Sequence, residues 1–142
     1  MAVAVVDTGV LVGVADAEDR HHEDAIEIVR EMDRGRLPTG RVTNYVVLET
    51  LNWIHARKRQ ETAVDLYRRL NESAGFGLVQ TAQADFGRAV ELFEQFDGLS
   101  FGDATTVAYM QREGIEHLYA FDDDFDAVAD LTRLTMPTNP FE

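Results

Sequence analysis

Short apolar runs without a polar interruption alternate along this chain with stretches of helical periodicity, and this alternation restricts the fold more than any other feature. One such run is Val3–Val6, and another is His117–Phe121 near the other end of the chain. Runs this short and continuous are typical of strands buried on both faces. Strands of this kind, separated by helices, build parallel β-α units. The sequence predicts an α/β fold over residues 1–142, one domain with a central parallel sheet and helices on both faces.

The periodicity and the breaker residues predict the remaining elements. Helical spacing of apolar residues predicts helices over Asp19–Met32, Asn44–Lys58, Glu61–Leu70, Ala84–Phe96 and Asp103–Arg112. Short extended segments are predicted at Gly40–Thr43, Leu78–Gln80 and Leu131–Met136. Gly35 and Gly114 stand where the first and the last of these helices are expected to end.

Composition excludes several classes of site. The chain contains no cysteine, which excludes disulfides, thiolate nucleophiles, cysteine–zinc sites and iron–sulfur clusters. No apolar run approaches the roughly 18 residues that cross a bilayer. The first residues carry no basic segment, so they do not predict a signal peptide. The expectation is a cytoplasmic protein without a membrane partner.

The charge is strongly acidic, with 26 Asp and Glu against 13 Lys and Arg and a formal net charge of −13. Lys58 is the single lysine, and the other cations are arginines. An acid-rich, lysine-poor composition is typical of proteins from cells that accumulate salt, and the alternative is an ordinary acidic cytosolic protein. Net negative charge argues against a nucleic-acid partner. Concentrated salt screens such repulsion within a few ångströms, so composition leaves an RNA partner open.

Two aspartates directly follow the predicted buried strands. Asp7 follows Val3–Val6, and Asp122 follows His117–Phe121. In parallel sheets ligands gather beyond the carboxyl ends of the strands, so both side chains are expected at the same edge. The alternative for each is a structural N-cap, because Asp often begins the helix after a strand.

Glu49 is predicted in the middle of a helix, among apolar neighbours. At one-turn spacing it has Tyr45, Val46 and Trp53, with Asn52 as the polar exception. A solvated Glu belongs on the opposite face of an amphipathic helix. A carboxylate surrounded by such residues needs a cation or hydrogen-bond donors to stay charged. The alternative is a Glu at the margin of the apolar stripe.

Asp103 begins a predicted helix of small and apolar residues. The segment Ser100-Phe-Gly-Asp103 matches a capping box with Asp in place of Glu, which is its structural alternative. Together with Asp7, Glu49 and Asp122 it would place four carboxylates at one edge of the sheet. A hard divalent cation such as Mg²⁺ relieves the repulsion between them and supports phosphodiester hydrolysis. Whether Asp123 and Asp124 join the site or form a solvated turn stays open.

These residues and their flanking sequences resemble the PIN-domain ribonucleases, and most of all the VapC toxins of prokaryotic toxin–antitoxin pairs. The likeness covers essentially the whole chain and is carried by the segments VVDTGVLVGVADAEDRHHEDA, TNYVVLETLNWI, LSFGDATTVAYMQREGI and LYAFDDDFD. The resemblance implies that Asp7, Glu49, Asp103 and Asp122 are catalytic. It also implies that Asp7, Asp103 and Asp122 bind Mg²⁺ or Mn²⁺. Gly9 departs from the family pattern, where Asn or Ser is more frequent.

The resemblance implies a metal-dependent endoribonuclease that hydrolyses RNA and acts as the toxin of a pair. It further implies a homodimer and a small antitoxin protein, which we expect to offer an Arg-bearing helix or tail to the acidic pocket. The predicted helices carry surplus apolar residues, some of which are expected to face a second copy of the chain: Val46, Val47, Leu51, Leu66, Tyr67 and Leu70. Arg57-Lys58-Arg59, the only cationic cluster, either holds RNA phosphates or is a solvated helix end. His22 is expected to pack or cap a helix.

Other functions fit the sequence less well. A haloacid-dehalogenase-type phosphatase requires Asp-x-Asp after the first strand, where this chain has Asp7-Thr8-Gly9. A response receiver requires a lysine after a late strand, and Lys58 lies in a predicted helix. Two alternatives remain within the PIN fold: a housekeeping RNA-processing nuclease, and a catalytically silent interaction module.

Overall fold

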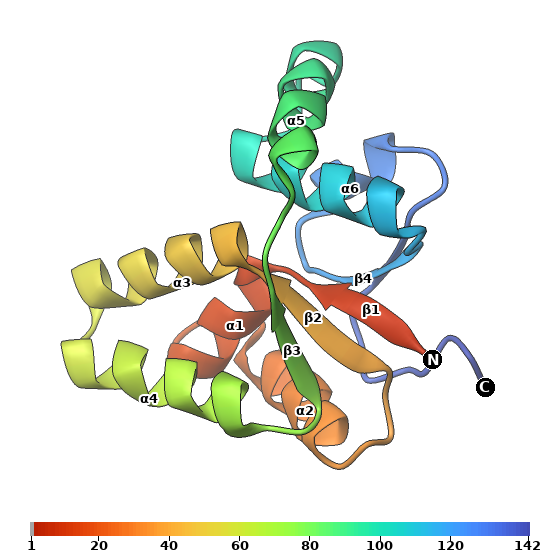
Figure 1. Cartoon of the computed structure of the whole chain (residues 1–142). Coiled ribbons are helices and arrows are strands. Elements are labelled where there is room, and N and C mark those ends of the chain that lie inside the picture. Colours follow the sequence, from red (N-terminus) through yellow and green to blue (C-terminus); the bar gives the residue numbers. More distant parts are fainter. Residues whose placement is uncertain (1) are drawn as a thin grey trace.

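The computed structural model describes residues 2–142 and contains one parallel sheet of five strands (Figure 1). The strands are β1 (Val3–Val6), β2 (Thr39–Thr43), β3 (Phe76–Val79), β4 (His117–Tyr119) and β5 (Thr132–Leu134). Their order across the sheet is β3-β2-β1-β4-β5, and every neighbouring pair is parallel. The predicted α/β fold with a central parallel sheet is confirmed.

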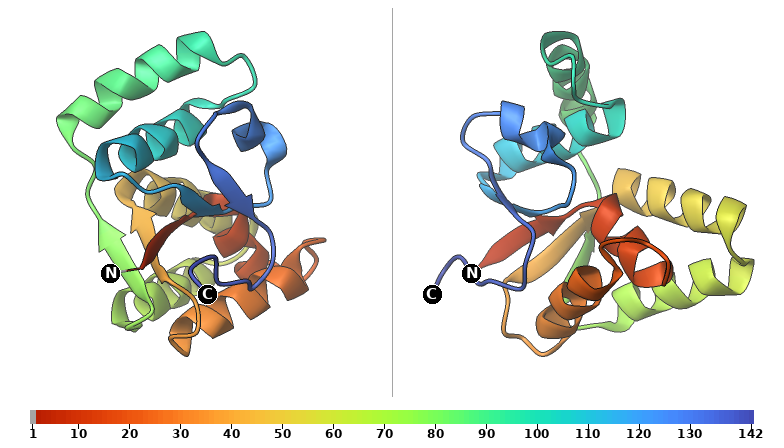
Figure 2. Two further views of the ribbon diagram at one scale, coloured as in Figure 1. Left: turned by 90° about the vertical axis from the view of Figure 1, so that its right-hand side faces the viewer. Right: turned by 180° about the vertical axis from the view of Figure 1, so that it is seen from behind.

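Helices cover both faces of this sheet (Figure 2). One apolar core joins the sheet to four helices: α1 (Thr8–Ala15), α2 (His22–Asp33), α3 (Asn44–Arg57) and α4 (Gln60–Glu72). A second core joins it to α5 (Gln83–Gln95), α6 (Phe101–Glu113) and the short 3₁₀ helix η1 (Asp123–Ala127). Strand β1 serves both cores, because Ala4 and Val6 face the first and Val5 faces the second. No helix within residues 2–142 is long and apolar enough to cross a membrane.

Several element boundaries differ from the prediction. Helix α2 begins at His22 and not at Asp19, because residues 16–21 form hydrogen-bonded turns. In these turns the Asp16 and Asp19 side chains accept hydrogen bonds from the amides of residues 18 and 21. The apolar stretch after Asp7 is itself a helix, α1. Strand β3 begins two residues earlier than predicted because it already pairs with β2 at Phe76.

Half of the surplus apolar residues named from the sequence are buried in the core of the chain itself. Val46, Leu66 and Leu70 are buried in the first core, so they are not among the residues that could face a second copy. The α3–α4 hairpin turns these side chains onto the sheet and leaves Tyr67 partly exposed. Apolar side chains are instead exposed on α3 and α5: Leu48, Phe86, Val90 and Phe93.

Candidate functional site

The ends of β1 and β4 bring Asp7 and Asp122 to one edge of the sheet. The two strands are parallel neighbours, and the Asp7 amide donates a hydrogen bond to the Tyr119 carbonyl at 3.0 Å. Asp7 is buried, whereas Asp122 is exposed. The Asp7 side chain stands at the N-cap of α1 without a well-formed capping hydrogen bond, although the amides of Thr8 and Gly9 lie close enough to act on its carboxylate.

The first turn of α6 adds a second buried carboxylate. Asp103 is 7% exposed, and its amide donates a hydrogen bond to the Ser100 hydroxyl at 3.1 Å. This bond is the N-cap half of the predicted capping box. The cap therefore fixes the backbone at the start of the helix and leaves the Asp103 carboxylate available at the sheet edge.

Burial and mutual repulsion strongly raise the pKa values of the two buried carboxyls, those of Asp7 and Asp103. Burial is the main cause that raises the pKa of Asp7 to about 7, and the charges of Glu49 and Asp122 add to it. Nearby amides of Thr8 and Gly9 offset part of this rise. Burial, followed by the charges of Asp7 and Asp122, raises the pKa of Asp103 to about 8. Asp7 and Asp103 thus lie within electrostatic range of each other and of both Glu49 and Asp122.

Glu49 approaches this group from α3, but not as expected. Its side chain is exposed, so the expectation that apolar neighbours enclose it is wrong. Its carboxylate lies against the first turn of α6, where a Cβ on Gly102 would come within 2.9 Å of Glu49 Oε2. Gly102 therefore permits this approach, and the sequence reasoning missed it. The signal was a glycine inside a helix, a position where glycine costs stability.

The acidic run after β4 forms a separate, exposed group. The Asp122 Oδ1 atom accepts a hydrogen bond from the Asp124 amide at 2.9 Å, so Asp122 caps η1 as the N-cap alternative predicts. Within residues 2–142, carboxylate oxygens approach within 4.8 Å of one another in the group Asp122, Asp123 and Asp124. The charge of Asp122 raises the pKa of Asp124. Asp7, Glu49 and Asp103 lie outside this tight group.

The donor set fits a hard divalent cation. Asp7 and Asp103 have no ion-pair partner within the described residues, as buried carboxylates otherwise require. The Thr8 hydroxyl, next to Asp7, is buried without a hydrogen-bond partner. Carboxylate and hydroxyl oxygens suit Mg²⁺ or Mn²⁺. The nearby Arg133 does not neutralise the buried pair, because it pairs with Asp126 at 2.9 Å and donates to carbonyl groups after β4.

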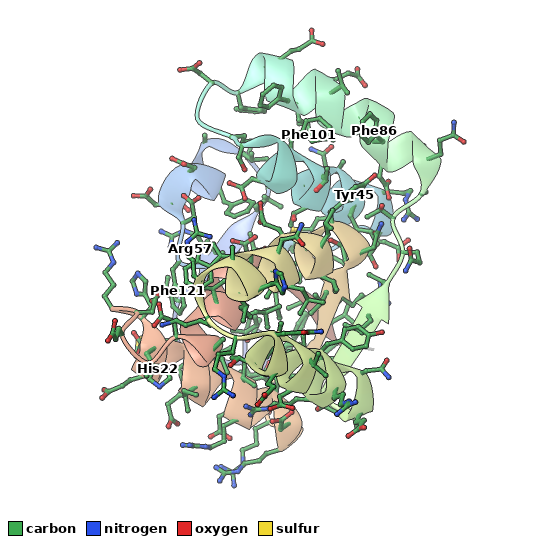
Figure 3. The ribbon with its side chains drawn as sticks, turned by 90° about the vertical axis from the view of Figure 1, so that its left-hand side faces the viewer. His22, Tyr45, Arg57, Phe86, Phe101 and Phe121 are labelled. Atoms are coloured by element: carbon green, nitrogen blue, oxygen red, sulfur yellow. The ribbon has the colours of Figure 1, made fainter. Side chains whose placement is uncertain are left out.

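His22 and the cationic cluster Arg57-Lys58-Arg59 make contacts within the fold. His22 Nδ1 lies 2.6 Å from the Gly13 carbonyl oxygen, so His22 holds α2 against α1 as expected (Figure 3). The cationic cluster after α3 is dispersed, since Lys58 pairs with Asp16 at 3.0 Å and Arg59 turns to α4. Arg57 alone turns back along α3.

Known proteins share the fold of this chain. The PIN domain family matches residues 4–131. Among solved structures, the chain is similar to VapC20 of Mycobacterium tuberculosis, described as a sarcin–ricin loop cleaving toxin. Identity is 26% and the TM-score 0.75, over 90% of this chain and 95% of that one. No curated protein sequence gives a significant match.

Two more distant structures share the fold. VapBC2 of Rickettsia felis, bound to a promoter DNA fragment, has 12% identity and a TM-score of 0.69 over 93% of this chain and 97% of that one. A toxin–antitoxin complex from Klebsiella pneumoniae has 19% identity and a TM-score of 0.61 over 96% and 98%. The fold is thus a PIN nuclease fold that resembles VapC toxins. With the family match spanning nearly all of its length, the chain belongs to the PIN domain family.

Proposed function

We propose that this chain is a Mg²⁺- or Mn²⁺-dependent endoribonuclease and the toxin of a cytoplasmic toxin–antitoxin pair. The observation that carries the proposal is the pair of buried aspartates, Asp7 and Asp103, without a cationic partner at the carboxyl edge of the sheet. Such a pair is costly unless a ligand neutralises it. The likeness to an RNA-cleaving toxin of M. tuberculosis supports RNA as the substrate.

Each carboxylate has a role that follows from its exposure. Asp7 and Asp103, which are buried, would hold the ion together with the exposed Asp122. Glu49 is exposed, and it would orient a water molecule and accept a proton from that water. When bound, a divalent cation supplies an activated water and stabilises the charge that develops in an in-line displacement at phosphorus.

Two protein partners belong to the proposal. The structures that resemble this chain include toxin–antitoxin complexes, which supports an antitoxin. An inhibitor of an acidic pocket gains most from an arginine, whose planar fork pairs with carboxylates through two hydrogen bonds. A second copy of the chain is proposed to cover the exposed apolar side chains of α5, where Phe86 and Phe93 pack edge-on against Phe101.

An RNA cleavage assay tests the proposal. Purified protein in KCl is expected to cleave end-labelled RNA with Mn²⁺ or Mg²⁺, to stop when EDTA is added, and to resume when the metal is restored. Protein carrying Asp103→Asn, purified in parallel, detects contaminating nucleases. Cleavage that persists in EDTA, or that Asp103→Asn leaves unchanged, would contradict the proposal. Absence of any cleavage would favour a silent interaction module.

A further inference from the structure

Asp122 differs from the two buried aspartates of the site in how it is held in place. Asp7 and Asp103 are buried, so the packed core around them restricts their side chains. Asp122 is exposed and lies in a run of three like charges. An exposed side chain keeps one position only if the backbone beneath it is held, because ordering it costs entropy. The contacts that hold this segment therefore decide where the Asp122 carboxylate lies.

Arg133 on β5 holds the segment around Asp122 at two points. Its Nη1 atom donates to the carbonyls of Ala120 and Phe121, the two residues directly before Asp122, at 3.3 and 3.4 Å. Its Nε and Nη2 atoms donate to the two carboxylate oxygens of Asp126 at 2.9 and 3.0 Å. Helix η1, which contains Asp126, lies beside β5 (Figure 2). One guanidinium thus connects the end of β4 to η1, on either side of the acidic run.

Arginine is the side chain that suits this arrangement. Its guanidinium has five donors in a rigid plane, whereas lysine has one nitrogen on a flexible stem. The two parallel hydrogen bonds to Asp126 fix the plane, and Nη1 is then directed to the β4 carbonyls. The Arg133 side chain is only 18% exposed, so neighbouring atoms restrict it as well. Asp126 therefore orients Arg133, and Arg133 holds the backbone before Asp122.

Arg133 also places a positive charge near a site that is proposed to bind a cation. Its hydrogen bonds to Asp126 raise the pKa of Arg133, and the charges of Asp123 and Asp122 add to this rise. The guanidinium is therefore within electrostatic range of Asp122. Charge alone would make Arg133 weaken the binding of a divalent cation. A favourable effect of Arg133 on metal binding must come from geometry, so the two effects have opposite signs.

We infer that Arg133 is a positioning residue for the metal site, because it holds the backbone before Asp122 so that this carboxylate reaches the ion bound by the buried aspartates. The inference rests on the proposed function and adds to it a residue outside the acidic group. Arg133 touches neither the ion nor the substrate and acts through Asp122. Residues that orient metal ligands in this way typically change metal affinity about tenfold or more.

Isothermal titration with Mn²⁺ at pH 8 and one fixed KCl concentration separates position from charge. Arg133→Met keeps the apolar stem but removes the guanidinium, and we expect it to bind Mn²⁺ about tenfold more weakly than the wild type. Loss of the positive charge alone predicts the opposite result, tighter binding. Unchanged or tighter binding of Mn²⁺ by the folded variant would overturn the inference.

The variant Arg133→Lys keeps the charge and loses the planar fork. A lysine cannot pair with both oxygens of Asp126 and also reach both carbonyls, so we expect Mn²⁺ binding to stay at least about threefold weaker than in the wild type. Full recovery of the affinity would show that a positive charge is sufficient, and it would overturn the positioning role.

Arg112 supplies a matched control, because its guanidinium also holds an aspartate through two hydrogen bonds. Its Nε and Nη2 atoms donate to Asp85 at 2.7 and 3.0 Å. Arg112 lies in the last turn of α6, at the opposite end of the helix from Asp103. Arg112→Met is therefore expected to bind Mn²⁺ within about twofold of the wild type. Equal losses in Arg112→Met and Arg133→Met would mean that general destabilisation lowers the affinity, and would overturn the inference.

Hydrogen exchange in EDTA tests the effect on the backbone without any metal. The Asp124 amide donates to Asp122 Oδ1 at 2.9 Å, and this bond depends on the position of the loop. Amides of residues 121–124 are expected to exchange about fivefold faster in Arg133→Met than in the wild type. The variant should remain folded, because Phe125 is fully buried and anchors η1 independently. Unchanged exchange in this segment would contradict the inference.

A double variant tests whether Asp126 acts through Arg133. Asp126→Asn keeps the guanidinium but weakens the bonds that fix its plane, so about threefold weaker Mn²⁺ binding is expected. Arg133→Met/Asp126→Asn is expected to bind Mn²⁺ within about twofold of Arg133→Met alone. Losses that add up in the double variant would mean that Asp126 acts independently, and would overturn its orienting role.

The outcomes for this inference and for the proposed function are distinct. If the wild type binds Mn²⁺ and cleaves RNA while Arg133→Met binds Mn²⁺ equally well, the inference fails and the proposed function stands. If Arg133→Met weakens Mn²⁺ binding as expected but the wild type cleaves no RNA, the inference stands and the nuclease proposal fails. If the wild type binds no Mn²⁺, both fail.

Discussion

Asp85 and Asp7 are both buried, yet Asp85 has a cationic partner and Asp7 has none within residues 2–142. Asp85 is 2% exposed and accepts hydrogen bonds from Arg112 Nε at 2.7 Å and Arg112 Nη2 at 3.0 Å. Arg112 therefore holds the pKa of Asp85 below its usual value. Asp7 is 6% exposed and has no such partner, and burial raises its pKa to about 7. Burial alone therefore does not distinguish these two aspartates, whereas the presence or absence of a cationic partner does.

The positions of the two residues agree with this difference. Asp85 lies in the first turn of α5, where it also accepts from the Ala82 amide at 2.8 Å, and its pairing with Arg112 ties α5 to α6. Asp7 lies at the carboxyl edge of the sheet, where parallel folds bind ligands. The first carboxylate contributes to the fold, and we propose that the second holds a metal ion.

The largest contrast is expected in catalysis. Asp7→Asn should lower the rate of RNA cleavage by at least about a hundredfold, because it removes a charge that holds the ion. Asp85→Asn should leave the rate per folded molecule within about twofold of the wild type. Initial rates with Mn²⁺, normalised to the folded fraction from circular dichroism, provide the measurement. A comparable loss in Asp85→Asn would break the comparison.

The same two variants are expected to change metal-free stability in opposite directions. Asp85→Asn should lower the free energy of unfolding by about 2 kcal/mol, since it weakens charge-assisted hydrogen bonds to a partly exposed arginine. Asp7→Asn should raise it by about 1 kcal/mol or more at pH 8, because an unpaired buried charge is removed. Denaturation by guanidinium in EDTA measures both, and destabilisation by Asp7→Asn would assign Asp7 a structural role.

The pH dependence of stability sharpens the contrast further. A raised folded-state pKa means that the folded protein holds protons that the unfolded chain has already lost. Metal-free stability should therefore fall between pH 4 and pH 8 as Asp7 and Asp103 ionise. Asp85 affects stability in the opposite direction, because its pKa is lowered in the folded protein. Its ion pair stabilises the fold at pH values above the pKa that Asp has in the unfolded chain. This contribution is lost as the pH falls through the lowered pKa of the folded protein.

Thermal unfolding in EDTA at several pH values tests this third prediction. The variant Asp7→Asn should show a flatter decline between pH 4 and pH 8 than the wild type. A decline that is equally steep in this variant would mean that other groups cause it.

The smallest effect is expected at Gly102. In Gly102→Ala the new Cβ would come 2.9 Å from Glu49 Oε2, so the flexible Glu49 side chain should move away. The cleavage rate is expected to fall about threefold to tenfold with little change in thermal stability. Gly87→Ala on α5 is the control, because a Cβ there meets nothing within 4 Å. An unchanged rate in Gly102→Ala would show that the position of Glu49 is not critical.

The sequence predicts the part of the site that depends on strand direction. Asp7 and Asp122 follow buried strands, and parallel pairing of β1 with β4 then places them at one edge. The exposure of Glu49 could not be predicted in this way. A helical wheel gives the residues on a face, but not whether another element covers that face.

The ion pair between Asp85 and Arg112 could not be predicted from the sequence either. Its partner Arg112 is 27 residues away and on another helix, and no periodicity relates the two. The same limit applies to Val46, Leu66 and Leu70, whose apolar character predicts burial but not whether the covering surface lies in this chain or in a partner. The packing of the helices decides both which residue pairs with Asp85 and which surface covers these apolar side chains.

Isothermal titration with Mn²⁺ at pH 8 tests most directly whether the unpaired carboxylates form a metal site. The wild type and Asp85→Asn are expected to bind Mn²⁺ with similar heat and affinity. The double variant Asp7→Asn/Asp103→Asn, confirmed as folded by circular dichroism, is expected to show no binding. If this double variant binds Mn²⁺ as the wild type does, the buried pair does not hold a metal, and the account of this site is wrong.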